Sequence, residues 1–443
     1  MATPRREQKR INVLPNPDAE RSGTKHYAAL LKKCEFFSLI YHWHSELSDI
    51  KVEVAKKSIK NTFKPKSKQD SISVLTKVQD DGKHGEVKAS DHLFDLLYLC
   101  PVQIGTPPQV MNLNFDTGSS DLWVWSTQLD PITQARGSPK HNIFDPRSSS
   151  TFKQTSSRWR IRYGDGSTAS GTVGTDNLTL GGLTVEHQAI ELARKLSEDF
   201  INIPGDGLLG LAFGKINTVK PKPVATPVEN MMTQDDIAEG EELFTCYLGS
   251  WRDTNERDKD ESFYTFGYVD QDVLKRCGVD KPHYVPVDTA NGFWQFSSSS
   301  ATVDGEFFDR PGNTAIADTG TTLALVEDRL CEAIYKKIPG ARFDERRQGW
   351  VFPVGLKPDR LPRVTLAVGD VQFEIQKEDL GFTGINEDEQ YGGIQSRGNA
   401  KFDILGDTWL KGVYAIFDQG KQRFGCVQRV EEEQNVTVAS QKR

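Results

Sequence analysis

Short apolar runs, each closed by glycine, proline, aspartate or serine, follow one another along the chain from residue 93 onward. Runs of this length that are rich in β-branched and aromatic residues and bounded by turn-forming residues are typical of β-strands. We therefore predict strands at residues 99–104, 109–115, 122–125, 159–163, 183–192, 263–269 and 371–375.

Helical patterns are rare in the same stretch. Residues 227–238 follow Thr226, a favourable N-cap, and begin with Pro227, which suits the first position of a helix. Residues 327–338 carry apolar side chains at four-residue spacing, which places them on one helical face. The pattern as a whole predicts a mostly-β protein with a few short helices.

An internal repeat divides the chain into two similar halves. The sequence FDTGSS at 115–120 recurs as ADTGTT at 317–322, and each copy is followed by two apolar residues and a glycine, at 208–210 and at 404–406. Matched order and spacing indicate two lobes of like topology, and 443 residues exceed the size of one ordinary core. We predict an N-terminal lobe at 91–280, a C-terminal lobe at 281–430 and a polar tail at 431–443.

The charge is unevenly distributed along the sequence. Residues 1–90 hold 18 lysines and arginines against 11 acidic residues, a net charge of +7, whereas the rest of the chain has a net charge of −14. A basic arm in front of an acidic body is either a solvated or nucleic-acid-seeking tail, or a pro-segment whose charge neutralises the body that it covers. The motifs favour the pro-segment, so we expect no nucleic-acid partner.

The two Asp-Thr-Gly motifs carry the candidate chemistry. An apolar strand followed by Asp-Thr-Gly places a carboxylate at a tight turn, because glycine lets the backbone double back. One such turn is a weak signal. Here there are two, and each is followed at a similar distance by an apolar-apolar-glycine segment, which predicts that Asp116 and Asp318 lie together. Two adjacent carboxylates share one proton, so one can accept a proton from water while the other donates to a carbonyl oxygen.

These motifs resemble those of the pepsin-like aspartic proteases, and the residues before Asp116 and those at 391–397 are similar to fungal members. The resemblance covers residues 93–429. It implies a mostly-β, bilobal pepsin-like fold, with two topologically similar β-barrel-like lobes and a central cleft. It also implies an aspartic endopeptidase with an acid pH optimum that acts on polypeptide substrates.

The resemblance assigns supporting roles to four hydroxyl residues. It implies that Thr117 and Thr319 bond across the two active-site loops. It also implies that Ser119 and Thr321 donate hydrogen bonds to the outer oxygens of the two aspartates, which lowers the pKa of the pair.

The family's flap, a hairpin that closes over the substrate, matches residues 161–167, and Asp165-Gly166 is a strong hairpin turn in its own right. The resemblance implies that Tyr163 bonds to Trp123 and shields the site from water; an ordinary half-buried strand aromatic is the alternative. Asp165 is a candidate partner for a substrate lysine just before the scissile bond. The substrate-binding candidates are Tyr163, Gly164, Asp165, Gly118, Gly320 and Thr322.

Four apolar residues next to the first distal glycine are candidates for the walls of apolar substrate subsites. They are Leu208, Leu209, Leu211 and Phe213. Packing into the core is the preferred interpretation for all four.

An inactive relative that binds a peptide or protein in its cleft is the competing interpretation. Both aspartates and both hydroxyl neighbours are present, which favours the enzyme. His42 and His44 lack further ligands at a recognisable spacing, so we expect neither metal nor cofactor. We expect a monomer.

The sequence gives conflicting signals for the cellular location of the protein. No apolar stretch reaches the length of a transmembrane helix, and no apolar signal segment follows the charged start, whereas the resemblance implies secretion or a vacuolar location. Many relatives carry a disulfide in the second lobe, but Cys331 has no cysteine between it and Cys426, which speaks against that bridge.

Overall fold

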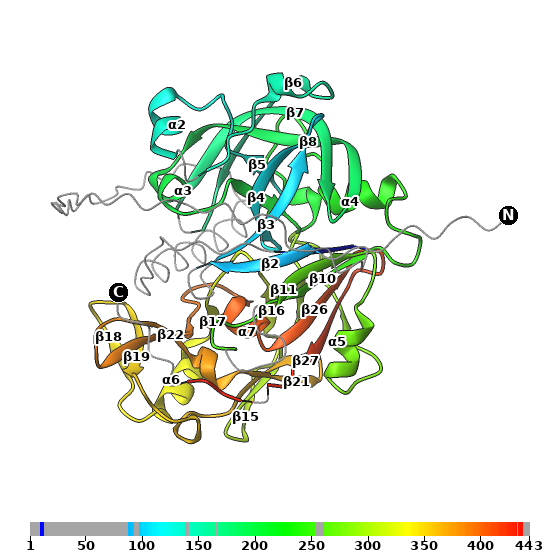
Figure 1. Cartoon of the computed structure of the whole chain (residues 1–443). Coiled ribbons are helices and arrows are strands. Elements are labelled where there is room, and N and C mark those ends of the chain that lie inside the picture. The colour runs from blue at the N-terminus through cyan, green and yellow to red at the C-terminus, as the bar shows by residue number, and fades with distance from the viewer. Residues whose placement is uncertain are drawn as a thin grey trace, which may run out of the picture.

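The computed structural model describes residues 9–12, 87–92, 97–137, 141–164, 166–253, 261–431 and 433–436. The predicted basic arm lies outside these ranges except for two short strands, and His42, His44, Asp165 and most of the polar tail lie outside them too. Figure 1 shows an upper and a lower lobe with a shared sheet between them.

Six strands of the N-terminal half close into a barrel. In order of pairing they are β3 (Leu97–Ile104), β4 (Gln109–Asp116), β9 (Gly207–Gly210), β5 (Leu122–Val124), β8 (Leu183–Leu196) and β7 (Thr168–Leu180). β7 pairs back with β3, which closes the ring. β6 (Lys153–Arg162) pairs with β7 on the outside of this barrel. This half forms the upper lobe of Figure 1.

Three smaller sheets build the C-terminal half. The first contains β13 (Gln295–Ser297), β16 (Thr314–Ala317), β25 (Asp403–Leu405), β17 (Ala324–Val326) and β24 (Ile394–Ser396). The second contains β15 (Glu306–Asp309), β14 (Ser300–Val303), β20 (Val364–Val368) and β21 (Val371–Ile375). The third contains β18 (Arg342–Asp344), β19 (Gly349–Pro353), β23 (Glu389–Gly392) and β22 (Gly381–Gly384).

Strands from both halves meet in the sheet that joins the lobes, and each half contributes one block of neighbouring strands. Its order is β12 (His283–Pro286), β27 (Arg423–Gln428), β26 (Val413–Asp418), β10 (Leu243–Tyr247), β11 (Ser262–Phe266) and β2 (Val87–His92), followed by β3. β1 (Lys9–Asn12) also pairs with β11. Figure 1 shows β2, β10, β11 and β26 between the upper and lower lobes.

The strands around the two Asp-Thr-Gly motifs repeat one topology. β4 pairs parallel with β9, and β9 pairs antiparallel with β5. In the other lobe β16 pairs parallel with β25, and β25 pairs antiparallel with β17. In each lobe the distal apolar-apolar-glycine segment is thus the strand that lies between the two arms of the Asp-Thr-Gly loop. The predicted mostly-β, bilobal pepsin-like fold with like lobes is confirmed.

Short helices connect the strands. They are α2 (Pro131–Gly137), α3 (Glu198–Asn202), α4 (Pro227–Thr233), α5 (Gln271–Arg276), α6 (Asp328–Lys336) and α7 (Asp407–Leu410). Single 3₁₀ turns occur at η1 (Pro146–Ser148), η2 (Gly214–Ile216), η3 (Pro358–Arg360) and η4 (Lys377–Leu380).

Several predicted boundaries were wrong at their ends. The helix predicted at 227–238 has the expected Thr226 cap but ends at Thr233, because Asp235 turns the chain with a φ of 57°. The strand predicted at 263–269 ends at Phe266, where Gly267 takes a φ of 83°. β6 begins six residues before the predicted start of 159, in a stretch whose exposed polar side chains give no apolar signal.

Candidate active site

The first Asp-Thr-Gly motif is the turn that follows β4. Asp116 is the last residue of this strand and is only 2% exposed. Its Oδ1 accepts from the Gly118 amide at 2.8 Å, and its Oδ2 accepts from the Ser119 hydroxyl at 2.5 Å. The distal strand holds the turn from below, since the Leu211 amide donates to the Asp116 carbonyl at 2.8 Å. The local hydrogen bonds therefore fix the orientation of this carboxylate.

The second motif has the same geometry. Asp318 is fully buried and directly follows β16. Its Oδ1 accepts from the Gly320 amide at 3.0 Å, and its Oδ2 accepts from the Thr321 hydroxyl at 2.6 Å. The Asp318 amide donates to the Leu405 carbonyl of β25 at 3.1 Å. The two lobes thus present their aspartates in equivalent ways.

Two threonines bond the loops to each other across the lobe interface. The Thr117 hydroxyl donates to the Ala317 carbonyl at 2.8 Å and accepts from the Thr319 amide at 3.0 Å. The Thr319 hydroxyl makes the mirror-image pair, donating to the Phe115 carbonyl at 2.6 Å and accepting from the Thr117 amide at 3.1 Å. All four bonds are buried, so they hold the two loops in one fixed arrangement.

Each glycine of the two motifs faces the aspartate of the opposite lobe. A Cβ added at Gly118 would lie 2.5 Å from Asp318 Oδ1, and one added at Gly320 would overlap Asp116 Oδ1. The oxygens that do not bond Ser119 or Thr321 therefore point toward the partner loop. This places the two carboxylates opposite each other, and only glycine leaves room for them.

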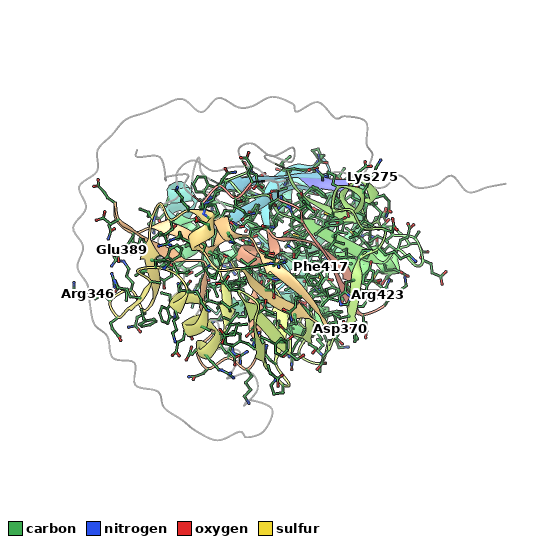
Figure 2. The ribbon with its side chains drawn as sticks, turned by 90° about the horizontal axis from the view of Figure 1, so that it is seen from below. Lys275, Arg346, Asp370, Glu389, Phe417 and Arg423 are labelled. Atoms are coloured by element: carbon green, nitrogen blue, oxygen red, sulfur yellow. The ribbon has the colours of Figure 1, made fainter. Side chains whose placement is uncertain are left out.

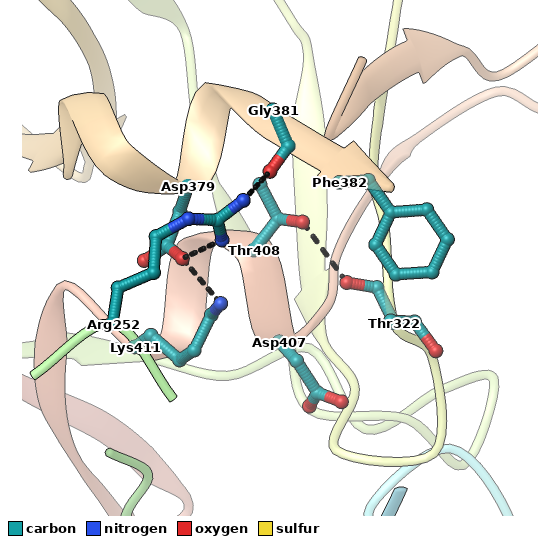
Figure 3. A pocket seen from close by; sticks show the side chains of 8 residues that line it. All are labelled: Arg252, Thr322, Asp379, Gly381, Phe382, Asp407, Thr408 and Lys411. Atoms are coloured by element: carbon teal, nitrogen blue, oxygen red, sulfur yellow. Dashed lines mark hydrogen bonds and ion pairs between the residues drawn. The ribbon is translucent and has the colours of Figure 1, made fainter. Parts of the chain in front are cut away.

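A small cavity lies behind the second loop. It has a volume of about 10 Å³ and is lined by Arg252, Thr322, Asp379, Gly381, Phe382, Asp407, Thr408 and Lys411. Figure 3 shows Lys411 and Arg252 converging on Asp379, while the Thr408 hydroxyl donates to the Thr322 carbonyl at 3.0 Å. A space of this size holds at most about one water molecule, so it supports the loop rather than binding substrate.

The hairpin of β6 and β7 carries Tyr163 over the first loop. The Tyr163 amide donates to the Ser167 carbonyl at 2.9 Å, and Gly166 has the positive φ of 84° that this tight turn requires. Trp123 Nε1 donates to the Tyr163 hydroxyl at 2.8 Å. Burial raises the pKa of Tyr163 well above its usual range, as do the charges of Asp121 and Asp116, so this hydroxyl stays protonated.

Comparison with known proteins identifies the family of this two-lobed site. The profile of the family described as eukaryotic aspartyl protease matches residues 97–429. Aspergillopepsin-1 of Aspergillus flavus is 38% identical over 345 residues, which cover 77% of this chain and 79% of the relative. Penicillopepsin-1 of Penicillium rubens is 38% identical over 334 residues, covering 75% and 78%. The chain belongs to the eukaryotic aspartyl protease family. This confirms the resemblance to fungal pepsin-like aspartic proteases and the predicted aspartic endopeptidase activity.

Most of the apolar residues proposed as subsite walls of this aspartyl protease lie in its core. Leu209 and Leu211 are essentially fully buried, and Phe213 is 8% exposed and packs on Trp294 at a ring distance of 4.7 Å. Leu208 is half-buried beside the aromatic cluster that contains Trp123 and Tyr163. Leu208 therefore remains the best-placed of the four for a substrate contact.

A buried acidic pair behind the flap of the protease was not predicted. Asp121 and Glu191 are fully buried, and their carboxyls lie close enough for the charge of Asp121 to act on Glu191. Thr218 Oγ1 donates to Asp121 Oδ1 at 2.5 Å, and Asn217 Nδ2 donates to Glu191 Oε1 at 3.0 Å. The sequence held one sign of this pair: Asp121 and Glu191 are each a lone acidic residue in an otherwise apolar run, DLWVW and AIELA.

Burial raises the pKa of both members of this pair, and the charge of Asp121 raises that of Glu191 further. Since the pKa of Glu191 in the folded state lies above its usual 4.5, the stability that its protonated form contributes is complete below about pH 4.5 and is lost as the pH rises toward the folded pKa. The fold of the protease is thus more stable in acid on account of this pair.

Replacing Glu191 with Gln should remove the loss of stability that ionisation of Glu191 causes as the pH rises. The amide can donate to Asp121 at any pH, so we expect Glu191→Gln to raise the free energy of unfolding at neutral pH by about 1–3 kcal/mol and to change it little in acid. Urea unfolding across this pH range measures the difference. Glu186→Gln, an exposed position on the same strand, is the matched control. An equal gain at both pH values would contradict the assignment.

Within the described ranges, no group of three or more His, Cys, Asp and Glu side chains is arranged to hold a metal, and no helix is long and apolar enough to cross a membrane. In the same part of the chain, Cys100, Cys246, Cys331 and Cys426 form no disulfide.

Proposed function

We propose that Asp116 and Asp318 form the catalytic dyad of this aspartic endopeptidase. The observation that carries the proposal is the reciprocal packing of each carboxylate against the glycine of the other motif. When two carboxylates are held this close, repulsion between their charges disfavours the state in which both are ionised, so the pair keeps one proton over a wide pH range. That proton belongs to the pair and not to either residue.

The shared proton supports both halves of the reaction. The ionised carboxylate takes a proton from water as the water oxygen adds to the scissile carbonyl carbon, and the protonated carboxyl donates to the carbonyl oxygen. The resulting diol then returns a proton to the dyad while the dyad protonates the leaving nitrogen, and the C–N bond breaks. No covalent enzyme intermediate forms.

The surrounding residues would prepare this reaction. The hydroxyls of Ser119 and Thr321 hydrogen-bond the outer oxygens, which favours the ionised form of the pair and would place activity in acid. Tyr163, held by Trp123, would close over the substrate and exclude water. Gly118, Gly164, Gly320 and Thr322 remain the proposed neighbours of the substrate backbone.

Hydrolysis of an unfolded protein from acid to neutral pH tests the proposal. We expect activity to be highest in acid and to be abolished by a statine-type inhibitor, whose hydroxyl imitates the diol. Tight inhibitor binding without any hydrolysis would instead favour the inactive peptide-binding interpretation.

We also propose that residues 1–90 are a pro-segment, because their net charge opposes that of the body and β1 pairs with β11 in the sheet between the lobes. Acid should release this segment, since protonated body carboxylates attract it less. N-terminal sequencing after incubation in mild acid should show a new start near residue 90. Full activity with the arm still attached would rule out this role.

A further inference from the structure

A row of basic side chains crosses the outer face of the β6–β7–β8 ribbon. In the strand register Arg160 lies opposite Ser170, and Ser170 lies opposite Lys195. Residues paired in this way share one face of a sheet, so the two cations flank the small serine. A register shift after Ser170 adds Arg194 beside them, and Arg194 and Lys195 are both exposed.

Two more cations extend this row at the edge of the ribbon. Arg158 and Lys220 exchange two backbone hydrogen bonds, of 3.2 Å and 2.8 Å, which fixes both residues side by side. Both side chains are exposed. Together with Arg160, Arg194 and Lys195 they line one groove of about 820 Å³, which we call the basic groove.

Within the part of the chain that the structure describes, the cations of the basic groove have no acidic partner. Among the residues that the structure describes, none of these five side chains forms an ion pair or a side-chain hydrogen bond. The groove contains one carboxylate, that of Asp130, and its oxygens accept from the Ile132 amide and from the amide and hydroxyl of Thr133. Asp130 therefore caps α2, and among the described residues it pairs with none of the five cations.

The floor of the groove reaches the residues that support the flap. It includes Trp159, whose ring stacks on Trp123 at 6.1 Å, and Trp123 in turn donates to Tyr163. Thr218, which bonds the buried Asp121, also lines the floor. A ligand in the groove would thus lie behind the flap and outside the pair of Asp-Thr-Gly loops.

We propose that the basic groove binds an acidic segment of a polypeptide substrate. Five cations that form no ion pair within the described ranges outnumber the single carboxylate of this concave surface, so they focus a positive potential there although residues 91–443 have a net charge of −14. The groove therefore selects negative ligands locally. The groove is large enough for several residues of an extended chain. The identity of the ligand as substrate rests on the catalytic dyad proposed above; the binding itself does not.

Direct binding tests the groove without catalysis. The probe is a fluorescent hexa-aspartate peptide of D-amino acids, which a protease does not cut, titrated with the full chain near pH 5. Aspartate is ionised there, since its ordinary pKa is about 3.9. We expect Arg160→Gln/Lys195→Gln to weaken binding about tenfold, and we expect binding to weaken as salt is added.

A matched control removes the same charges elsewhere. Lys275 and Arg346 are exposed, form no ion pair within the described residues, and lie on the periphery of the molecule in Figure 2. Lys275→Gln/Arg346→Gln should bind the probe like the unmodified protein. Equal weakening in both double variants would show a general charge effect and would overturn the proposal.

Catalysis supplies the second readout. Two peptides share one cleavage site and carry a tail of either four aspartates or four asparagines. The ratio of their kcat/KM values should exceed one for the unmodified protein and fall toward one for Arg160→Gln/Lys195→Gln. A ratio of one for the unmodified protein, or tighter binding of an RNA oligonucleotide than of hexa-aspartate, would overturn the proposal. Probe binding without any hydrolysis would instead refute the proposed catalytic dyad alone.

Discussion

Asp116→Asn and Asp318→Asn should each reduce kcat by at least about a thousandfold, and the double variant should be scarcely worse than either single variant. An amide in place of either carboxylate removes the shared proton, and both the base and the acid of the reaction depend on it. Groups that act as one unit give losses that do not add. Single-turnover hydrolysis of an unfolded protein substrate measures all three variants.

Folding should survive these substitutions. Asparagine has nearly the size of aspartate, and its oxygen can still accept from the Gly118 or Gly320 amide. Thermal unfolding of the same preparations checks this point. Asp407→Asn is a useful control, because Asp407 is also buried but lies behind the second loop (Figure 3). A well-folded single dyad variant with substantial activity would exclude the two-carboxylate mechanism.

The parts of the site that the sequence could predict are local or repeated. Each Asp-Thr-Gly turn is encoded by consecutive residues, and the distal Leu-Leu-Gly and Ile-Leu-Gly segments are β9 and β25, which pair with the strands that carry the aspartates. The same logic located the hairpin at 161–167. A feature could be predicted from the sequence where a short segment contains its own turn-forming residues or where a second copy repeats it.

The remaining features depend on pairing between distant strands. Glu191 lies next to Trp123 only because β8 pairs parallel with β5, and no local signal gives that register. The same is true of Arg160 and Lys195, which the β6–β7–β8 ribbon brings into one row. The sheet between the lobes likewise joins β10 and β11 to β26 and β27, which no periodicity along the chain reveals.

Thr302→Val provides the reference for a test of the bonds between the loops. The Thr302 hydroxyl makes one partly buried contact with the Thr365 hydroxyl at 2.7 Å, on a sheet that contains neither strand leading into an Asp-Thr-Gly motif. Losing a single bond of this kind should lower the free energy of unfolding by no more than about 1 kcal/mol.

Thr319→Val should lower the free energy of unfolding by about 2–4 kcal/mol. Valine has nearly the shape of threonine, so packing is kept, but the Phe115 carbonyl loses its donor and the Thr117 amide loses its acceptor. Both groups belong to fully buried residues, and each unsatisfied buried group costs about 1–3 kcal/mol. Because these bonds also hold the two aspartates in register, kcat should fall more than KM rises. Urea unfolding and steady-state kinetics measure the two effects. A loss no larger than that of Thr302→Val would mean that the crossed threonine bonds do not couple the lobes.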